Sequence, residues 1–246
     1  MSVPAWPYPA RCAHRGAGKL APENTLAAIR HGAALGYRMF EFDVKLSADG
    51  VLVLMHDPTV DRTTSGHGRL ASYTLGQIAR LDAGSWHSPA FAGEPVPTLA
   101  SVAAWLRANQ CLANIEIKPC PGREAETGAA VALEARALWA GAAVPPLLSS
   151  FSPQALAAAA AVAPELPRAL LMHRLPDDWL AQVRALGCVG IDLNHELLDA
   201  ALIAAAHAQH LKVLAYTVND PARAAALAAI GLDLLITDAV DRIAFA

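Results

Sequence analysis

Short apolar runs alternate with longer segments of helical periodicity along the chain. An apolar run bounded by turn residues indicates a buried strand, whereas apolar residues spaced three and four apart over a longer stretch indicate a helix. Eight strands are predicted on this basis: Arg11–His14, Tyr37–Asp43, Leu112–Ile117, Pro146–Ser150, Arg168–Met172, Val189–Leu193, Lys212–Val218 and Leu232–Thr237. The helices predicted between them are Thr25–Leu35, Leu99–Ala108, Arg123–Trp139, Pro153–Ala161, Asp177–Leu186, Leu198–Ala208 and Pro221–Ala229.

The order of these elements predicts the fold class. Strict alternation of strand and helix means parallel βα units, and eight such units at this length predict an α/β protein with a (β/α)8 TIM barrel. A doubly wound open sheet is the alternative, but no glycine-rich phosphate loop follows the first strand. No short-period repeat or low-complexity linker divides the chain, so residues 1–246 are expected to form a single barrel domain.

One hairpin departs from the regular alternation. Asp49-Gly50 is a strong signal for a two-residue turn, which requires positive φ. With that turn, Asp43 would face His56 directly across an antiparallel pair. Val51–His56 would then be an extra arm on an otherwise regular barrel.

The hairpin belongs to a longer irregular region after the second strand. Residues 44–97 are expected to form a small insertion, because the sequence from Asp57 onward is rich in turn residues. One short helix is predicted in it near Leu75–Leu81. Asp57, Asp61 and Arg62 are expected to fix the insertion, and Asp57 could also orient a neighbouring group.

Carboxylates collect where the predicted strands end. Glu41 and Asp43 lie two residues apart on the second strand, so both side chains share one face. Glu116 lies near the end of the third strand, and barrel enzymes place their sites at the rim where the strands end. Three clustered carboxylates repel one another, and a hard divalent cation with oxygen ligands removes that conflict.

Cationic and imidazole side chains are predicted at the same rim. His14 and Arg15 follow the first strand, His56 arrives from the hairpin, and Lys118 lies two residues after Glu116. Cationic side chains and a metal can hold a phosphate while imidazoles transfer protons. The combination points to phosphate chemistry.

The motifs that carry these residues resemble those of the glycerophosphodiester phosphodiesterase family. They are "AHRG", "PENT", "EFDV", "HD…DRTT", "IEIKP" and "TVN", in this order from about Ala13 to the C-terminus. The family has a (β/α)8 barrel with an early insertion and hydrolyses glycerophosphodiesters to sn-glycerol 3-phosphate and an alcohol. The resemblance implies that Glu41, Asp43 and Glu116 bind one divalent cation, Mg²⁺ or Ca²⁺. It also implies that His14 and His56 are the general acid and base, and that Arg15 and Lys118 contact the phosphate.

Other positions receive weaker assignments. Tyr216 stands where the family motif often has Trp, and we expect it to contact the substrate and make the pocket wall more polar. Glu23 stays open between contact with a glycerol hydroxyl or the metal shell and a purely structural role. Asn24 is expected to be the N-cap of the helix that follows it. The remaining histidines show no partner in sequence and are expected to be structural or solvated: His31, His67, His87, His173, His195, His207 and His210.

Composition excludes several classes of protein. The apolar fraction is 54% and the mean hydropathy is +0.32, but the longest uncharged stretch, Ala137–Pro164, is broken by prolines and is not expected to span a membrane. The net charge of −3 argues against a general nucleic-acid binder. The N-terminus lacks a signal-peptide pattern, and the four cysteines have no CxxC spacing, so a cytoplasmic location is expected.

Two other functions compete with the hydrolysis of soluble glycerophosphodiesters. A lysophospholipase D-type enzyme would use the same chemistry on lysophospholipids. A non-catalytic barrel that binds phosphorylated ligands is the alternative from another class. The expected partner is a small-molecule substrate, and no stable membrane anchoring is expected. Three questions stay open: whether the protein forms a homo-oligomer, which histidine is the acid and which the base, and whether water attacks directly or a cyclic phosphate forms first.

Overall fold

A computed structural model describes residues 6–243. Residues 1–5, the start of the segment in which no signal peptide was found, and residues 244–246 lie outside the described residues. The strands are β1 (Arg11–Ala13), β2 (Met39–Leu46), β3 (Leu52–Leu54), β4 (Leu112–Ile117), β5 (Leu147–Ser150), β6 (Arg168–Met172), β7 (Gly190–Asn194), β8 (Lys212–Tyr216) and β9 (Leu234–Thr237). The α-helices are α1 (Leu26–Ala34), α2 (Leu75–Ile78), α3 (Leu99–Ala108), α4 (Glu124–Leu138), α5 (Pro153–Val162), α6 (Trp179–Ala185), α7 (Ala200–Ala208) and α8 (Pro221–Ala229).

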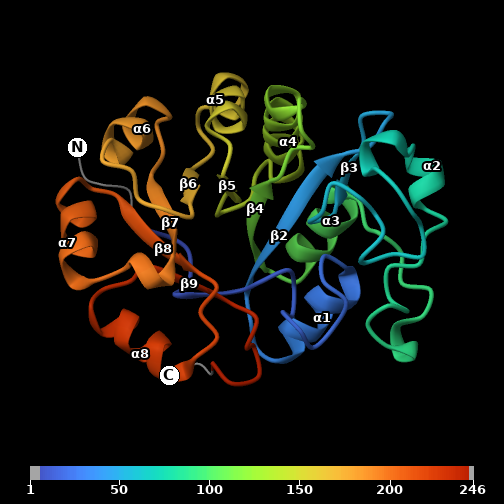
Figure 1. Cartoon of the computed structure of the whole chain (residues 1–246), viewed down its shortest axis with the longest axis horizontal. Helices are drawn as coiled ribbons and strands as arrows, with labels where there is room; N and C mark the ends of the chain where they lie inside the picture. Colours follow the sequence, from blue (N-terminus) through green and yellow to red (C-terminus); the bar gives the residue numbers. More distant parts are fainter. Residues whose placement is uncertain (1–5, 244–246) are drawn as a thin grey trace.

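Parallel strands close into a barrel with the helices around it (Figure 1). Within residues 6–243 the strand order is β1-β9-β8-β7-β6-β5-β4-β2, and pairing of Ala13 with Phe40 joins β1 to β2. Each pair in this ring is parallel, whereas β3 pairs with β2 alone and is antiparallel. The predicted TIM barrel and its eight parallel strands are confirmed, and β3 is the extra arm.

The hairpin between β2 and β3 differs from the prediction by one residue. Val44 pairs with Leu54, so Asp43 comes opposite Met55 and not His56. The loop has three residues because the Ser47 amide bonds to the Val51 carbonyl. The Ser47 hydroxyl accepts the Val51 amide at 2.8 Å, a contact that the Asp49-Gly50 pattern alone does not reveal. His56 therefore lies two residues beyond the end of β3, where the strand geometry no longer fixes its direction.

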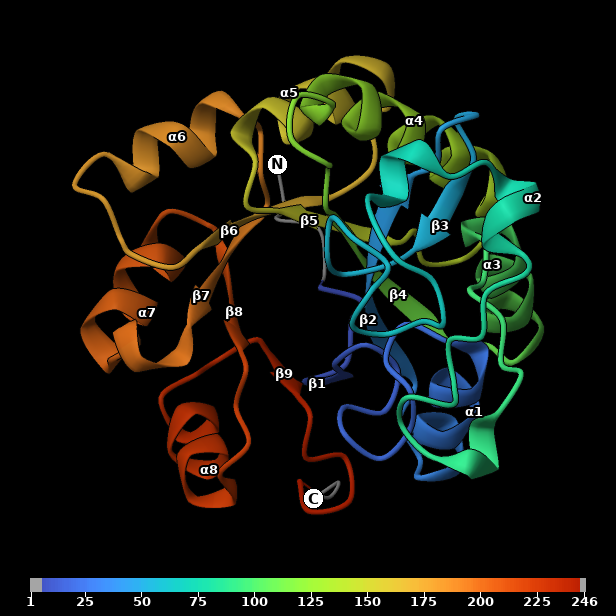
Figure 2. The ribbon, with the colours of Figure 1, turned by 45° about the vertical axis from the view of Figure 1, so that its right-hand side comes forward.

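The insertion has a small hydrophobic core of its own. Its buried residues are Val53, Met55, Val60, Leu70, Ile78, Ala83 and Val96. The short helix predicted near Leu75–Leu81 is present as α2, and two 3₁₀ turns, Leu70–Ser72 and Pro89–Phe91, accompany it. Figures 1 and 2 agree that the insertion lies on the α1 and α3 side of the barrel, away from α6 and α7.

The start of α1 corrects a second prediction. Thr25, not Asn24, is the N-cap, and its hydroxyl accepts the Ala28 amide at 3.1 Å. Asn24 has a φ of +58°, a left-handed conformation that asparagine tolerates better than most residues. This backbone conformation directs the Asn24 side-chain amide to Asp43. Asn24 therefore binds Asp43 and does not cap α1.

The lower half of the barrel interior is apolar. It is filled mainly by side chains from the strands, namely Tyr8, Cys12, Met39, Leu147, Ala169, Leu214, Leu234 and Ile236. This plug closes the end opposite the catalytic rim predicted above. None of the described helices is long and apolar enough to cross a membrane.

Candidate active site

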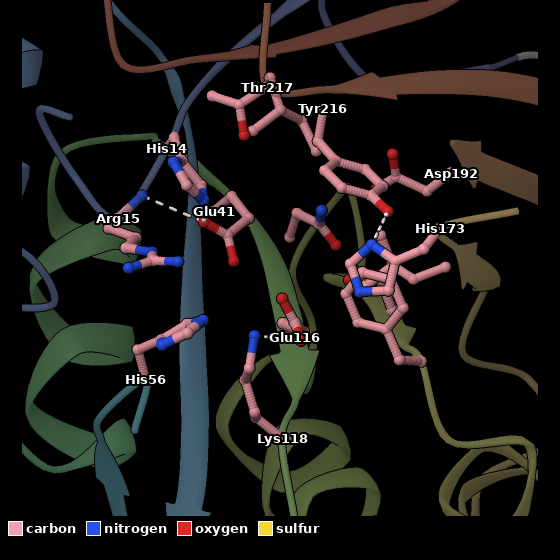
Figure 3. Close-up of a pocket in the computed structure, with 15 residues that line it drawn as sticks. His14, Arg15, Glu41, His56, Glu116, Lys118, His173, Asp192, Tyr216 and Thr217 are labelled. Atoms are coloured by element: carbon pink, nitrogen blue, oxygen red, sulfur yellow. Dashed lines mark hydrogen bonds and ion pairs between the residues drawn. The ribbon is translucent and has the colours of Figure 1, made fainter. Parts of the chain in front are cut away.

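A cavity of about 510 Å³ opens among the C-terminal ends of the barrel strands (Figure 3). Its walls come from all eight parallel strands or the residues directly after them. The lining residues are His14, Arg15, Glu41, His56, Asn114, Glu116, Lys118, Ser149, Phe151, Leu171, His173, Asp192, Tyr216, Thr217 and Ile236. Most of the predicted site residues are among them, so the rim expected from the sequence is the place where they meet.

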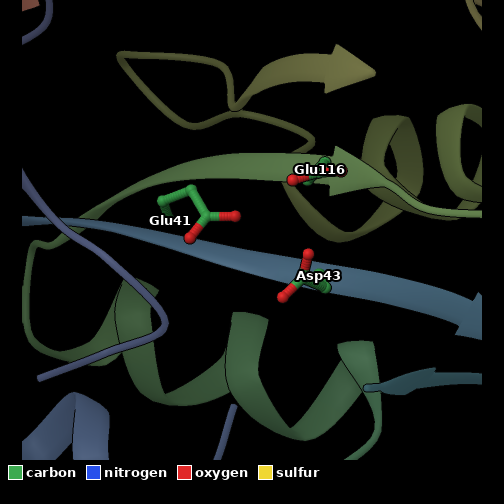
Figure 4. A group of neighbouring side chains, drawn as sticks. All are labelled: Glu41, Asp43 and Glu116. Carbon is green, nitrogen blue, oxygen red and sulfur yellow. The ribbon is translucent and has the colours of Figure 1, made fainter. Parts of the chain in front are cut away.

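Three carboxylates form an acidic triad at this cavity (Figure 4). Glu41 and Asp43 come from β2, and Glu116 lies on β4 directly across from Asp43. One oxygen from each lies within 4.8 Å of the others, and all three side chains are buried. The Oε1 atom of Glu41 has no hydrogen-bond partner among the described residues. A cation with oxygen ligands fits this arrangement.

Burial and mutual repulsion perturb the triad strongly. Burial, together with the charges of Asp43 and Glu116, raises the pKa of Glu41 well above its usual range. Burial and the charge of Asp43 also raise the pKa of Glu116. Burial alone would raise the pKa of Asp43, but Lys118 and Arg15 outweigh it and hold that pKa far below the usual range. The triad therefore carries one firmly ionised member and two that retain protons readily.

Two cationic side chains border the triad. Lys118 Nζ lies 2.9 Å from Glu116 Oε1 and 3.1 Å from Asp43 Oδ1. Arg15 Nε lies 3.5 Å from Asp43 Oδ2, and the Arg15 amide donates to Glu41 at 3.0 Å. Both cationic groups are only about one-fifth exposed and line the cavity, so they raise its affinity for an anion.

Each of the two predicted catalytic histidines has a carboxylate on its Nδ1 atom. His14 Nδ1 lies 2.6 Å from Asp238 Oδ1, and His56 Nδ1 lies 2.6 Å from Asp57 Oδ1. A carboxylate at Nδ1 fixes the ring orientation and leaves Nε2 as the atom that can transfer a proton. His14 Nε2 lies 3.7 Å from Glu41 Oε2. Asn219 donates to the second oxygen of Asp238 at 3.1 Å and supports it.

The environment of His56 sets its proton affinity. Burial lowers the pKa of His56, and the neighbouring Asp43 and Asp57 oppose that shift only in part. Hydrogen bonds from Arg62 lower the pKa of Asp57 to about 2, so Asp57 stays ionised at neutral pH. Although Asp43 and His56 are not directly opposed on the hairpin, they are close enough to interact electrostatically.

An ion-pair network ties the insertion to this side of the cavity. Arg62 binds Asp57 through Nε at 2.7 Å and Glu23 through Nη1 at 2.8 Å. Glu23 also accepts from Arg15 at 2.8 Å. The expected role of Arg62 and Asp57 in fixing the insertion matches these contacts. Glu23 is held between two arginines and is absent from the cavity lining, so these contacts favour the positioning of Arg15 over direct contact with a substrate.

Tyr216 lines the cavity as part of an aromatic wall. Its hydroxyl lies 2.9 Å from His173 Nδ1 and 3.1 Å from the Met172 carbonyl. The His173 ring stacks on Phe151 with centroids 4.1 Å apart. His173 showed no partner in the sequence, and the end of β6 brings it beside Tyr216 and Phe151 in the cavity wall.

The sequence interpretation gave no role in the site to several polar residues that lie there. Asn24 donates to Asp43 Oδ2 at 2.8 Å and accepts the Asp43 amide at 3.0 Å, so it fixes a member of the triad. Asn114, Ser149 and Asp192 line the cavity and are fully buried. A polar residue inside an apolar strand was the signal used for Glu41, and it would have found Asp192 in "VGIDLN" as well.

The comparisons with known proteins agree with this geometry. The model of the "Glycerophosphoryl diester phosphodiesterase family" matches residues 14–242. YhdW of Bacillus subtilis is 33% identical over 236 residues, which cover 93% of this chain and 94% of YhdW.

Solved structures give the same result. A phosphodiesterase of Oleispira antarctica, in complex with the product sn-glycerol-3-phosphate, has a TM-score of 0.90 at 35% identity, covering 96% of this chain and 95% of that one. A glycerophosphodiester phosphodiesterase of Agrobacterium tumefaciens has a TM-score of 0.79 at 29% identity, covering 95% of this chain and 97% of the other. The chain therefore belongs to the glycerophosphoryl diester phosphodiesterase family.

Proposed function

We propose that this enzyme hydrolyses soluble glycerophosphodiesters, the deacylated phospholipids, in a reaction that depends on a divalent cation and on His14 and His56. The products are sn-glycerol 3-phosphate and an alcohol. The observation that carries the proposal is a single cavity in which an acidic triad lies between two carboxylate-oriented histidines and two cationic side chains.

Glu41, Asp43 and Glu116 would hold the cation, Mg²⁺ or Ca²⁺. The unpartnered Oε1 of Glu41 and the raised pKa values of Glu41 and Glu116 support this assignment, because a cation would ligate that oxygen and offset the burial and mutual repulsion of the carboxylates. When bound, a divalent cation supplies charge stabilisation at the phosphate oxygens and lowers the pKa of a hydroxyl or water beside it. Oxygen ligands suit hard cations and leave the choice between the two metals open.

Arg15 and Lys118 would bind the phosphate. Both are held by the triad and by Glu23, so their side chains are already oriented before an anion arrives. Burial tends to lower the pKa of Lys118, but Asp43 and Glu116 outweigh it, so its ammonium stays charged. Their two charges would offset the negative charge that develops as the phosphorus is attacked.

His14 and His56 would transfer the protons. In Figure 3 both rings lie on the same side of the cavity as Arg15, and both Nδ1 atoms are already occupied by carboxylates. One Nε2 would accept the proton of the attacking hydroxyl while the other donates a proton to the departing alcohol oxygen. The attacking group is either water or the glycerol hydroxyl of the substrate, which would give a cyclic phosphate first.

Product release from two substrates tests the substrate assignment. We expect the protein to release sn-glycerol 3-phosphate from glycerophosphocholine, and to act at least about tenfold less efficiently on lysophosphatidylcholine, because an acyl chain adds apolar surface that a polar site cannot bury. Enzymatic detection of glycerol 3-phosphate and of choline measures both. A preference for lysophosphatidylcholine would support the lysophospholipase D-type alternative and contradict the proposal.

The carboxylate partners of the histidines give a pH-dependent prediction. Asp57→Asn removes an interaction that raises the pKa of His56, so that pKa should fall further. The limb of the kcat/KM profile that His56 controls should therefore move to lower pH, with kcat reduced by about 10²-fold. Asp61→Asn, on the exposed part of the same insertion, is the matched control and should leave the profile in place. An unchanged profile for Asp57→Asn would show that His56 does not transfer a proton in the rate-limiting step.

A further inference from the structure

Two groups of the cavity wall are each held by a carboxylate that lies behind them. Arg15 Nη1 donates to Glu23 Oε1 at 2.8 Å, and His56 Nδ1 lies 2.6 Å from Asp57 Oδ1. Arg15 and His56 line the cavity on the same side (Figure 3), whereas neither Glu23 nor Asp57 is among the described residues that line it. The two carboxylates therefore orient side chains of the cavity without lying in it themselves.

One guanidinium group joins these two carboxylates. Arg62 donates to Asp57 through Nε at 2.7 Å and Nη2 at 3.1 Å, and to Glu23 through Nη1 at 2.8 Å and Nη2 at 2.9 Å. Each carboxylate is thus bound by two nitrogen atoms at once, a geometry that restricts the direction of both partners. Glu23 lies 39 residues before Arg62, in the loop between β1 and α1. The guanidinium group therefore connects the insertion to that loop.

Arg62 favours the ionised form of both carboxylates. Burial alone would raise the pKa of Glu23, but hydrogen bonds and charge from Arg62 and Arg15 outweigh it and lower that pKa. The hydrogen bonds from Arg62 are also the largest cause that lowers the pKa of Asp57 to about 2. Two negative charges that bind the same guanidinium would repel each other without it. Arg62 thus holds together two carboxylates that would otherwise move apart.

These ion pairs are better suited to position side chains than to stabilise the fold. The Arg62 side chain is 44% exposed, whereas that of Glu23 is 13% exposed. Ion pairs that include an exposed side chain add little to the free energy of unfolding, because water screens them. A planar guanidinium with two bidentate partners nevertheless fixes the direction of both carboxylates. Loss of Arg62 should therefore disturb the two cavity groups more than it destabilises the protein.

We propose that Arg62 is a positioning residue for the reaction. Through Glu23 it orients the guanidinium of Arg15, which would bind the phosphate. Through Asp57 it orients the imidazole of His56, which would transfer a proton. Arg62 belongs to the insertion, so docking of the insertion onto the barrel completes both parts of the site at once. This inference rests on the roles that the proposed function gives to Arg15 and His56.

Arg62→Met tests the inference, because methionine removes all four hydrogen bonds and keeps an unbranched side chain. With Mg²⁺ at a fixed concentration, we expect kcat for release of sn-glycerol 3-phosphate to fall about tenfold and KM to rise about threefold, since both cavity groups lose their fixed direction. The affinity for inorganic phosphate, measured by calorimetry, should fall about threefold as well. The melting temperature should change by less than about 3 °C.

The pKa of His56 gives a readout that a purely structural role of Arg62 would leave unchanged. The charged groups that face His56 are Asp43 on β2, Lys118 after β4, Arg15 after β1 and the neighbouring Asp57. Arg62 shares Asp57 Oδ1 with His56, so its loss leaves that oxygen to His56 alone and also removes a positive charge. Both changes favour the imidazolium, so Arg62→Met should raise the pKa of His56, whereas Asp57→Asn should lower it. An NMR titration of the imidazole protons, assigned with His56→Ala, measures this shift without turnover.

Two further variants serve as controls. Arg80 is exposed on the same insertion, and Arg80→Met makes the same change in formal charge as Arg62→Met. It should leave kcat, phosphate affinity and the pKa of His56 unchanged. Arg62→Lys keeps the charge, but an ammonium group cannot bind two carboxylates in bidentate fashion, so it should restore only part of the lost kcat. Arg62→Lys also carries the test if Arg62→Met does not fold.

The outcomes separate this inference from the proposed function. A pKa of His56 that fell or did not move in Arg62→Met would overturn the inference, and so would equal effects of Arg80→Met. Unchanged kcat and phosphate affinity in folded Arg62→Met would overturn it as well. If the wild-type protein released no glycerol 3-phosphate, the proposed function would fail, while phosphate binding and the titration of His56 would still decide whether Arg62 positions these groups.

Discussion

His14→Ala and His56→Ala are each expected to lower kcat by about 10³-fold while KM changes by less than about threefold. The reason is geometric, because each imidazole lines the cavity and its Nδ1 atom is occupied by a carboxylate, so that Nε2 is the atom that can transfer a proton. Arg15 and Lys118, not the two rings, are expected to bind the phosphate. The loss should therefore appear in the chemical step.

The size of the double-variant effect adds information about the mechanism. If one ring is the base and the other the acid in the same step, removing both should cost less than the product of the two single losses, because residues that act as a unit are not additive. If the reaction passes through a cyclic phosphate, formation and opening of the ring use the two imidazoles in reversed roles. A cyclic product should then accumulate with one of the single variants, and phosphorus NMR would detect it.

The matched control for these variants is another histidine. His31 lies exposed in the last turn of α1, away from the cavity lining, so His31→Ala should keep full activity. Restoration of part of the His14→Ala activity by added imidazole would identify the lost group as a proton carrier. Full turnover in either His14→Ala or His56→Ala would contradict the catalytic assignment and favour a barrel that only binds phosphorylated ligands.

The residues found from the sequence share one property, which is that their position follows from strand periodicity. Glu41 and Asp43 share a face because they lie two apart on β2, and β4 places Glu116 in register with Asp43. The barrel itself followed from the alternation of elements, and α3, β4, β6 and α8 have the predicted boundaries. Periodic elements are thus predictable because neighbouring residues constrain one another.

The residues that were missed or misplaced depend on single contacts that have no period. The register of the hairpin changed by one because the Ser47 hydroxyl accepts the Val51 amide. Asn24 does not cap α1 as expected, because its positive φ turns its side chain to Asp43. Asp238 became the partner of His14 through loops that meet only in the folded barrel, whereas Asp57 directly follows its partner His56 and agrees with the expectation that it could orient a neighbouring group. Asp192 was within reach of the sequence argument, since it is an acid in an apolar strand just as Glu41 is.

Metal removal is expected to have an effect as large as loss of a histidine. A chelator should lower kcat by about 10³-fold or more, because charge stabilisation at the phosphate contributes several kcal/mol to the barrier. Glu41→Gln should do the same, since it replaces a carboxylate whose Oε1 has no other partner with a neutral group. Added Mg²⁺ or Ca²⁺ should restore the chelated enzyme but not Glu41→Gln at the same concentration. Release of glycerol 3-phosphate measures each case.

The triad also predicts the direction of the pH dependence of metal binding. Burial and mutual repulsion raise the pKa of Glu41 and raise the pKa of Glu116 to about 7, so the metal-free protein binds protons there at higher pH than ordinary carboxyl groups do. A cation binds the ionised carboxylates, and binding must therefore release protons. Metal affinity should rise as the pH increases and level off once both groups are ionised. Calorimetry in two buffers of different ionisation enthalpy measures the number of protons released.

A distant glutamate provides the control that separates ligation from general electrostatics. Glu165 is exposed, and Glu165→Gln makes the same change in formal charge as Glu41→Gln. It should leave metal affinity and proton release unchanged, whereas Glu41→Gln should reduce both, because it removes one titrating ligand. If the chelated enzyme kept full activity, the triad would be a structural cluster neutralised by Arg15 and Lys118 alone. If activity needed the metal but Glu41→Gln bound it normally, the cation would lie elsewhere and the buried Oε1 of Glu41 would need another partner.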